Sequence, residues 1–232
     1  HNITEQSIPL LGNSEETKIN ETDGKVSGVE IIIEKKKKTI TTDAVVVTTG
    51  GYGSNHEMIE SFRPDLKGYV STTAASSTGD GIKMIEQLGG ATVDMDQIQV
   101  HPTVVQDSGM LISETVRGEG AILVNQQGER FVNELETRDN VSAAETALPE
   151  QYAYLIFDNE LAKRAKQVEY YESEGATIKA DTIEELAQQI DIDPATLKAT
   201  LDTWNNNVKE QKDPEFGRET AMDYDLTTGP FY

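Results

Sequence analysis

The chain has 232 residues, contains no cysteine and carries a formal net charge of -21. Without cysteine it forms no disulfide, iron–sulfur cluster or thiolate zinc site, and no metal site is predicted. Its acidic balance disfavours nucleic acid and anionic lipid as partners, because both require a basic face. No apolar run approaches the roughly 18 residues of a membrane-spanning helix, and composition leaves cytoplasmic and extracytoplasmic locations open.

The first 50 residues predict strands and turns. Residues 26–33 (VSGVEIII) follow an Asp-Gly turn, and residues 43–47 (DAVVV) are interpreted as a buried apolar strand that ends in a glycine pair. The four lysines of residues 35–38 predict a solvated hairpin tip rather than a partner-binding site.

Two helices are predicted between residues 54 and 90. Asn55 or Ser54 caps a short helix that Pro64 stops, and TGDG at residues 78–81 opens a second helix. The glycines after the apolar run and those in TGDG leave the backbone open to a nucleotide or flavin. A tight turn and a capped helix explain the same residues equally well.

From residue 91 onward the sequence predicts a hairpin, a strand and further helices. Residues 121–124 and 130–133 flank NQQGE and predict the hairpin, and residues 152–157 predict the strand. Helix starts are predicted at Thr182, in a capping box with Glu185, and at Asp193, which precedes a proline. The last helix has one apolar face, assigned to the core, formed by Leu197, Leu201, Trp204 and Val208.

The segment 101–139 holds the residues best suited to catalysis. Glu114 and Arg117 are three residues apart, share a face of a helix or turn, and can pair. His101 is held extended by the proline after it, and Arg138 follows the hairpin and can return to the same place. An isolated Arg–Glu pair is usually a surface salt bridge. Here the surrounding small residues favour a site for an anionic substrate that receives a proton, since arginine acts as an acid only beside groups that tune and refill it.

Several motifs resemble the succinate dehydrogenase/fumarate reductase flavoprotein superfamily: HPT, LISETVRGEG, ILVNQQGERFVNE and TRD. Within it the chain most resembles the soluble single-chain fumarate reductases of the flavocytochrome c type and the urocanate reductases. VVVTTGGYGSN and STGDGIKMIEQLGG resemble FAD-contacting segments, and TWNNNVKEQKDPEFGR resembles a helix of the capping domain. The likeness covers nearly the whole chain and identifies it as an internal fragment of a longer protein.

The resemblance implies an α+β capping domain attached to a partial α/β FAD-binding domain. Residues 1–92 correspond to part of the FAD-binding domain, residues 93–220 to the capping domain that closes over the substrate, and residues 221–232 to the start of the return to the FAD-binding domain. The implied cofactor is FAD. The implied reaction is hydride transfer from flavin N5 to a small dicarboxylate or other enoate, with a proton supplied by an arginine.

The resemblance also assigns roles in catalysis. Arg138 corresponds to the proton donor, and Glu114 and Arg117 correspond to the relay that reprotonates it. His101, Ser113 and Glu114 correspond to substrate-binding groups, although the family more often has threonine where Ser113 stands.

Four further residues correspond to contacts with FAD. Val26, Gly50 and Gly51 match backbone positions near its adenosine half, and Asp80 matches a flavin-contacting acid. The glycine-rich GxGxxG fingerprint that grips the pyrophosphate is not in the sequence. We therefore expect this fragment alone to bind FAD weakly or not at all and to be inactive. The electron donor is left unassigned.

Two alternatives stay open. The substrate is fumarate, urocanate or another enoate, because the residues that distinguish them are expected outside this sequence. A different class, a non-catalytic cap-like binding module, predicts loss of the charged residues, and the presence of Glu114, Arg117 and Arg138 argues against it.

Overall fold

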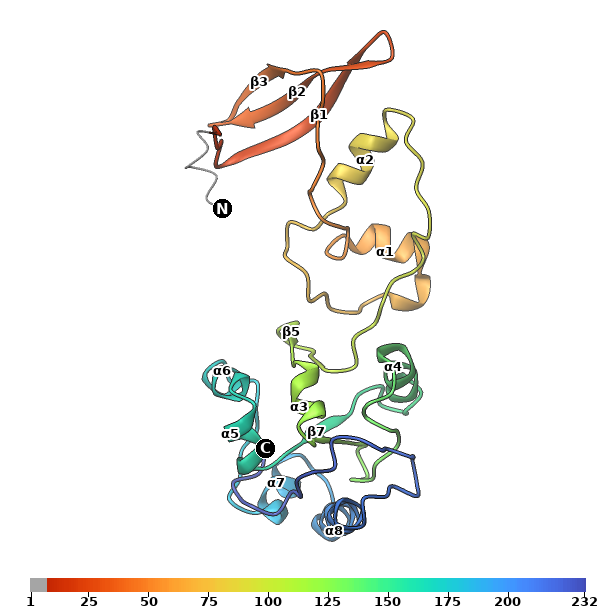
Figure 1. Ribbon diagram of the computed structural model, residues 1–232, viewed down its shortest axis with the longest axis vertical. Helices are drawn as coiled ribbons and strands as arrows, with labels where there is room; N and C mark the ends of the chain where they lie inside the picture. The colour runs from red at the N-terminus through yellow and green to blue at the C-terminus, as the bar shows by residue number, and fades with distance from the viewer. Residues whose placement is uncertain (1–7) are drawn as a thin grey trace. The chain divides into compact units, whose positions relative to one another are not determined.

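The computed structural model describes residues 8–232 and divides into two compact units, the first ending at Ile98 and the second spanning Gln99–Tyr232 (Figure 1). Each unit contains both helices and strands. This agrees with the mixed α and β content expected from the sequence. None of the helices in residues 8–232 has the length and apolarity needed to cross a membrane.

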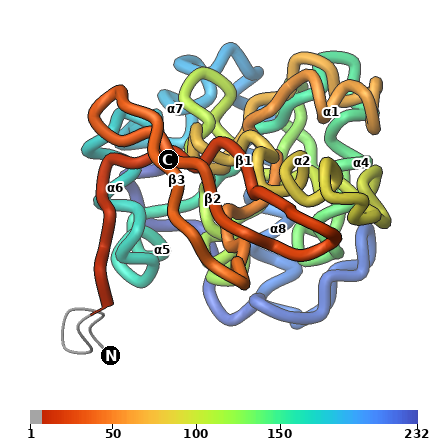
Figure 2. The backbone as a smooth tube through the Cα atoms, turned by 90° about the horizontal axis from the view of Figure 1, so that it is seen from above, coloured from red at the N-terminus to blue at the C-terminus, as the bar shows by residue number. Residues whose placement is uncertain are grey.

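The first unit begins with an antiparallel sheet of three strands in the order β1-β2-β3, coloured red to orange in Figure 2. The strands are β1 (Ser14–Thr22), β2 (Lys25–Ile33) and β3 (Lys36–Thr41). Gly24 and Lys35 lie in the turns between them and have φ values of 74° and 63°. Two-residue hairpin turns require this left-handed backbone. The lysine run thus begins at the predicted hairpin tip and continues along the exposed strand β3.

The buried strand expected over residues 43–47 is not formed. No strand in residues 8–232 pairs with this segment, and Val46 is 87% exposed. An apolar run becomes a buried strand only where neighbouring strands pair with its backbone and other elements cover its faces. The described part of the chain supplies neither, so this prediction was wrong for the chain as it stands.

Two short helices and a 3-10 turn complete the first unit: α1 (His56–Phe62), η2 (Pro64–Leu66) and α2 (Asp80–Glu86). The predicted cap of α1 is confirmed, because Oδ1 of Asn55 accepts a hydrogen bond from the Met58 amide at 3.0 Å. The Gly79 amide donates to the carbonyl of Gly51 at 3.1 Å. The loops that precede the two helices therefore lie against each other.

The second unit combines two small sheets with a set of helices. Strand β4 (Val104–Val105) pairs with β5 (Met110–Leu111), and β6 (Ile122–Val124) pairs with β7 (Tyr154–Ile156), both antiparallel. The helices are α3 (Glu114–Gly118), α4 (Arg138–Thr146), α5 (Asn159–Arg164), α6 (Gln167–Ser173), α7 (Ile183–Gln189) and α8 (Pro194–Glu210).

The predicted hairpin around NQQGE forms only in part. The turn closes with a hydrogen bond from the Asn125 amide to the Glu129 carbonyl at 2.9 Å, and Val124 forms one bridge with Arg130. Beyond that bridge β6 pairs with β7 instead. The reason is that Arg130 turns inward, where its buried side chain binds the Glu134 carboxylate, so the returning segment leaves the sheet.

The core of the second unit is built on α7 and α8. Trp204 is fully buried on α8, together with Leu197, Leu201 and Val208, which confirms the predicted apolar face. Thr182 and Asp193 cap the two helices by accepting hydrogen bonds from backbone amides, at 3.2 Å and 2.9 Å respectively. The predicted helix starts are therefore confirmed.

Candidate active site

The carboxylate of Glu114 lies at the centre of the charged residues singled out in the sequence. Its Oε1 atom accepts a hydrogen bond from Nε of Arg138, whose Nη2 also forms an ion pair with it. Nε2 of His101 lies 3.1 Å from the same oxygen. The second unit therefore brings three of the predicted residues together on one carboxylate oxygen.

The bonds of His101 define its tautomer. Nδ1 accepts a hydrogen bond from the Thr103 amide at 3.2 Å, so the proton resides on Nε2 and is donated to Glu114. Burial lowers the pKa of His101, the bond to Glu114 opposes this, and the charges of Arg117 and Arg138 lower it further. His101 is therefore a neutral hydrogen-bond donor at neutral pH.

Arg138 is the first residue of α4 and stands at an open face. Its Nη1 donates to Oε1 of Gln99 at 2.7 Å. The side chains of Arg138 and Glu114 remain 44% and 40% exposed, so a small anion can reach them. Gln99 was missed in the sequence, where a single glutamine before the HPT motif carries no recognisable signal.

Arg117 is held differently from the way its spacing suggested. No ion pair within residues 8–232 joins it to Glu114; its Nη1 instead donates to the backbone carbonyl of Glu134 at 2.6 Å. The side chain is buried, and burial lowers its pKa while the charge of Glu114 raises it. The predicted direct pair was wrong because Glu114, in the first turn of α3, binds Arg138 and His101.

Ser113 is the N-cap of α3. Its Oγ accepts from the Thr115 amide at 3.3 Å and donates to the Thr115 hydroxyl at 3.1 Å, while its amide donates to Oη of Tyr171. The hydroxyl therefore supports the helix that carries Glu114 and Arg117. A bond from Ser113 to a substrate stays a prediction.

The charges of the cluster suit an anion. Burial tends to raise the pKa of Glu114, but its own backbone amide, Arg138 and His101 outweigh this and hold the pKa at about 2. At neutral pH two arginines, one carboxylate and a neutral imidazole leave one net positive charge. Arginine guanidinium groups also match a carboxylate in a fork geometry.

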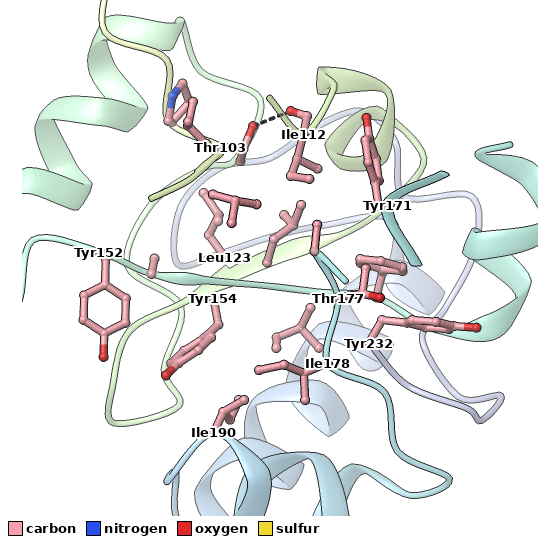
Figure 3. Close-up of a pocket in the computed structure, with 18 of the residues that line it drawn as sticks. Thr103, Ile112, Leu123, Tyr152, Tyr154, Tyr171, Thr177, Ile178, Ile190 and Tyr232 are labelled. Carbon is pink, nitrogen blue, oxygen red and sulfur yellow. Dashed lines mark hydrogen bonds between the residues drawn. The ribbon is translucent and has the colours of Figure 1, made fainter. Parts of the chain in front are cut away.

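The second unit contains a cavity of about 300 Å³ that is lined by residues of several segments, among them Thr103, Ile112 and Tyr171 (Figure 3). Thr103, whose amide binds His101, lines it and donates from its hydroxyl to the carbonyl of Ile112 at 2.7 Å. Glu145 also lines the cavity, and its buried Oε2 has no hydrogen-bond partner within residues 8–232. Burial raises the pKa of Glu145 to about 7.

The residues expected to contact FAD lie in the first unit. Gly50 has φ of 81°, and a Cβ atom built on Gly51 would meet nothing within 4 Å, so this loop is open to a flat group. Asp80 begins α2 and accepts from the Thr78 hydroxyl at 2.5 Å. Val26 lies in β2, paired with Glu21, and is not part of these loops. The open glycine pair fits the backbone approach expected for the cofactor.

Comparison with known proteins extends over the whole chain. The model of the family described as FAD binding domain matches residues 2–232. An NADH:fumarate oxidoreductase of Klebsiella pneumoniae is 44% identical over 232 residues, covering 100% of this chain and 25% of that protein. A urocanate reductase of Eggerthella lenta is 33% identical over 193 residues, covering 79% of this chain and 32% of that protein.

The fold is similar to that of a flavocytochrome c3 fumarate reductase in its open conformation, with a TM-score of 0.80 and 41% identity. The alignment covers 99% of this chain and 41% of that structure. The chain thus spans between 25% and 41% of the length of these three proteins. The family resemblance seen in the motifs is confirmed.

Proposed function

The chain belongs to the FAD binding domain family, and we propose that it is the proton-delivering part of an FAD-dependent reductase of small unsaturated carboxylates. Fumarate is the preferred substrate, as in the name of the Klebsiella relative. The observation that carries the proposal is the meeting of Arg138 and His101 on one oxygen of Glu114.

In the proposed reaction Arg138 supplies the proton. It stands at the open face of the cluster, where a substrate carbon can approach its guanidinium. Glu114 and Arg117 return a proton to it, because the carboxylate bonds Arg138 directly and acts on Arg117 through its charge. His101 and Ser113, the latter through its hydroxyl, bind a substrate carboxylate beside Glu114, and His101 exchanges its bond to Glu114 for one to the substrate.

FAD, when bound, supplies the hydride. We assign Gly50 and Gly51 to its adenosine half, with the Val26 backbone nearby, and Asp80 to its flavin side. The unoccupied space beside the Gly51 backbone supports the assignment of Gly50 and Gly51. Because the chain lacks the GxGxxG fingerprint, we propose that it does not hold FAD tightly without the remainder of such an enzyme.

We propose that residues 1–92 form part of the FAD-binding domain, that residues 93–220 form the capping domain, and that residues 221–232 begin the return. The division of the chain between Ile98 and Gln99 supports a boundary in this region. Residues 221–232 lie within the second unit, where Phe231 forms bridges with Asp158 and Ala180. Closure of the capping domain would exclude water from the reacting groups.

The test uses the full-length protein that contains this sequence, purified with flavin. Wild-type protein should oxidise its reduced flavin with fumarate, and Arg138→Ala should abolish this while flavin absorbance is unchanged. Arg63→Ala, which removes a surface arginine paired with Asp65, is the matched control and should keep full activity. Near-normal turnover of Arg138→Ala would rule out the proton-donor role.

Urocanate is the second candidate substrate because of the similarity to the Eggerthella urocanate reductase. A panel of fumarate, urocanate and acrylate distinguishes the two by kcat/KM. Reduction of none of them by flavin-loaded protein would favour the non-catalytic binding module instead.

A further inference from the structure

A closed ring of contacts surrounds Arg117. Its guanidinium donates to the Glu134 carbonyl at 2.6 Å. The Glu134 carboxylate binds Nη1 of Arg218 at 3.0 Å, and Nη2 of Arg218 donates to the carbonyl of Arg117 at 2.9 Å. Both ends of Arg117, its backbone and its charged head, are thus tied to the same pair of buried residues.

Arg218 makes more contacts than a charge partner for Glu134 requires. Its side chain is fully buried, and it also donates to the carbonyls of Ala121, Thr220 and Ala221 at 2.9 to 3.1 Å. The guanidinium lies 4.6 Å from the centre of the Trp204 ring. A planar group with five donors can satisfy this set, and lysine cannot.

Arg117 depends on this arrangement because its head has few other contacts. Its Nε is buried and has no hydrogen-bond partner within residues 8–232. A buried cation without partners is costly, and a mobile one delivers protons poorly because transfer requires fixed geometry. The contact with the Glu134 carbonyl is therefore the main constraint on the guanidinium.

We propose that Glu134 and Arg218 are positioning residues that hold Arg117 for proton return to Arg138 through Glu114. The role in proton return rests on the proposed reductase function. The positioning of Arg117 by Glu134 and Arg218 depends only on the contacts between these residues. The sequence motifs FVNE and FGR, which contain Glu134 and Arg218, thereby acquire a part in the reaction without touching substrate.

Arg218→Lys is the test, and Arg130→Lys is its matched control. Arg130 is also buried, binds the same Glu134 carboxylate at 2.8 Å and lies 4.7 Å from the Trp204 ring, but within residues 8–232 it forms no hydrogen bond with Arg117. Both variants lose a buried fork of hydrogen bonds. Only Arg218→Lys loses the hydrogen bond to the Arg117 carbonyl. If the variants act only by destabilising the fold, both should change exchange and kcat equally. If Arg218 positions Arg117, only Arg218→Lys should change them.

The first measurement is hydrogen exchange at the Arg117 side chain, followed by NMR in the arginine-labelled full-length protein that contains this sequence. Arg218→Lys should accelerate exchange about tenfold, the effect of losing one charge-assisted hydrogen bond, and Arg130→Lys should leave it near the wild-type rate. Equal exchange in both variants overturns the inference and leaves the proposed function untouched.

The second measurement is kinetic, in the flavin-loaded full-length protein. Arg218→Lys should lower kcat about tenfold at unchanged KM and raise the solvent deuterium isotope effect, because proton return becomes limiting. Arg130→Lys should change neither. Faster exchange with wild-type kcat and isotope effect overturns the link to proton return, and a wild-type protein that reduces no enoate overturns that link together with the proposed function.

Discussion

His101 and Glu114 share a hydrogen bond of 3.1 Å in which the neutral imidazole is the donor. The Thr103 amide occupies the other ring nitrogen, so the imidazole cannot reverse its role without breaking that bond. The pKa of His101 therefore depends on burial first and, in the opposite direction, on the carboxylate beside it.

Glu114→Gln should lower the pKa of His101 further. Burial already lowers it, and the Glu114 carboxylate opposes that shift through its hydrogen bond and charge, while Arg117 and Arg138 remain. An NMR titration of the imidazole, with the exposed Glu150→Gln as control, measures the change. A higher pKa in Glu114→Gln would contradict the arrangement.

Acid should destabilise the wild-type chain more than Glu114→Gln. The folded-state pKa of Glu114 is held at about 2, below the ordinary 4.5, so its contribution is complete above pH 4.5 and is lost as pH falls towards 2. The difference in unfolding free energy between wild type and Glu114→Gln should narrow from pH 6 to pH 3. Urea denaturation at both pH values tests this, and a constant difference would refute it.

Glu145→Gln should stabilise the chain increasingly as pH rises from 4.5 to 7, and by a constant amount above that. Burial raises the folded-state pKa of Glu145 from 4.5 to about 7, so the ionised carboxylate costs stability as pH rises through that interval. The upper limit of the gain is about 3 kcal/mol at pH 8, with little at pH 4. Denaturation midpoints of wild type and Glu145→Gln at pH 4 and pH 8 measure this gain in stability. Glu150→Gln, at an exposed site, should show no such dependence.

Trp204→Phe should cost far less than Trp204→Ala. The ring is fully buried, the guanidinium groups of Arg130 and Arg218 lie 4.7 Å and 4.6 Å from its centre, and its Nε1 has no hydrogen-bond partner within residues 8–232. Phenylalanine keeps an aromatic face for both cations and loses no hydrogen bond. We expect urea denaturation to show a loss of unfolding free energy of about 3–5 kcal/mol for Trp204→Ala and about 1–2 kcal/mol for Trp204→Phe. Equal losses would contradict this account.

Val46→Asp should be tolerated in this chain, whereas Val29→Asp should not. Val46 is 87% exposed, while Val29 in β2 is 8% exposed. An exposed substitution changes stability by less than about 0.5 kcal/mol, and a buried unpaired charge costs several times more. Thermal denaturation of the two variants compares them directly. Similar losses would indicate that residues 43–47 are buried after all.

Local sequence was sufficient for the features that depend on neighbouring residues. Asn55, Thr182 and Asp193 were recognisable as helix caps because a cap binds an amide two or three residues away. The apolar face around Trp204 followed from helical spacing. The family was recognisable because its motifs are contiguous. The prediction of a buried strand at residues 43–47 was wrong for the opposite reason, because burial of this segment depends on partners distant in sequence.

The order of residues was enough to reveal the family and to identify His101, Glu114 and Arg138 as candidates for one cluster. Tertiary structure alone decided how the bonds are distributed, because the partners are far apart in the chain: Arg138 and Glu114 by 24 residues, and Arg218 and Arg117 by 101. A carboxylate oxygen binds whichever donors the fold brings to it, and spacing along one helix cannot reveal donors that arrive from other segments.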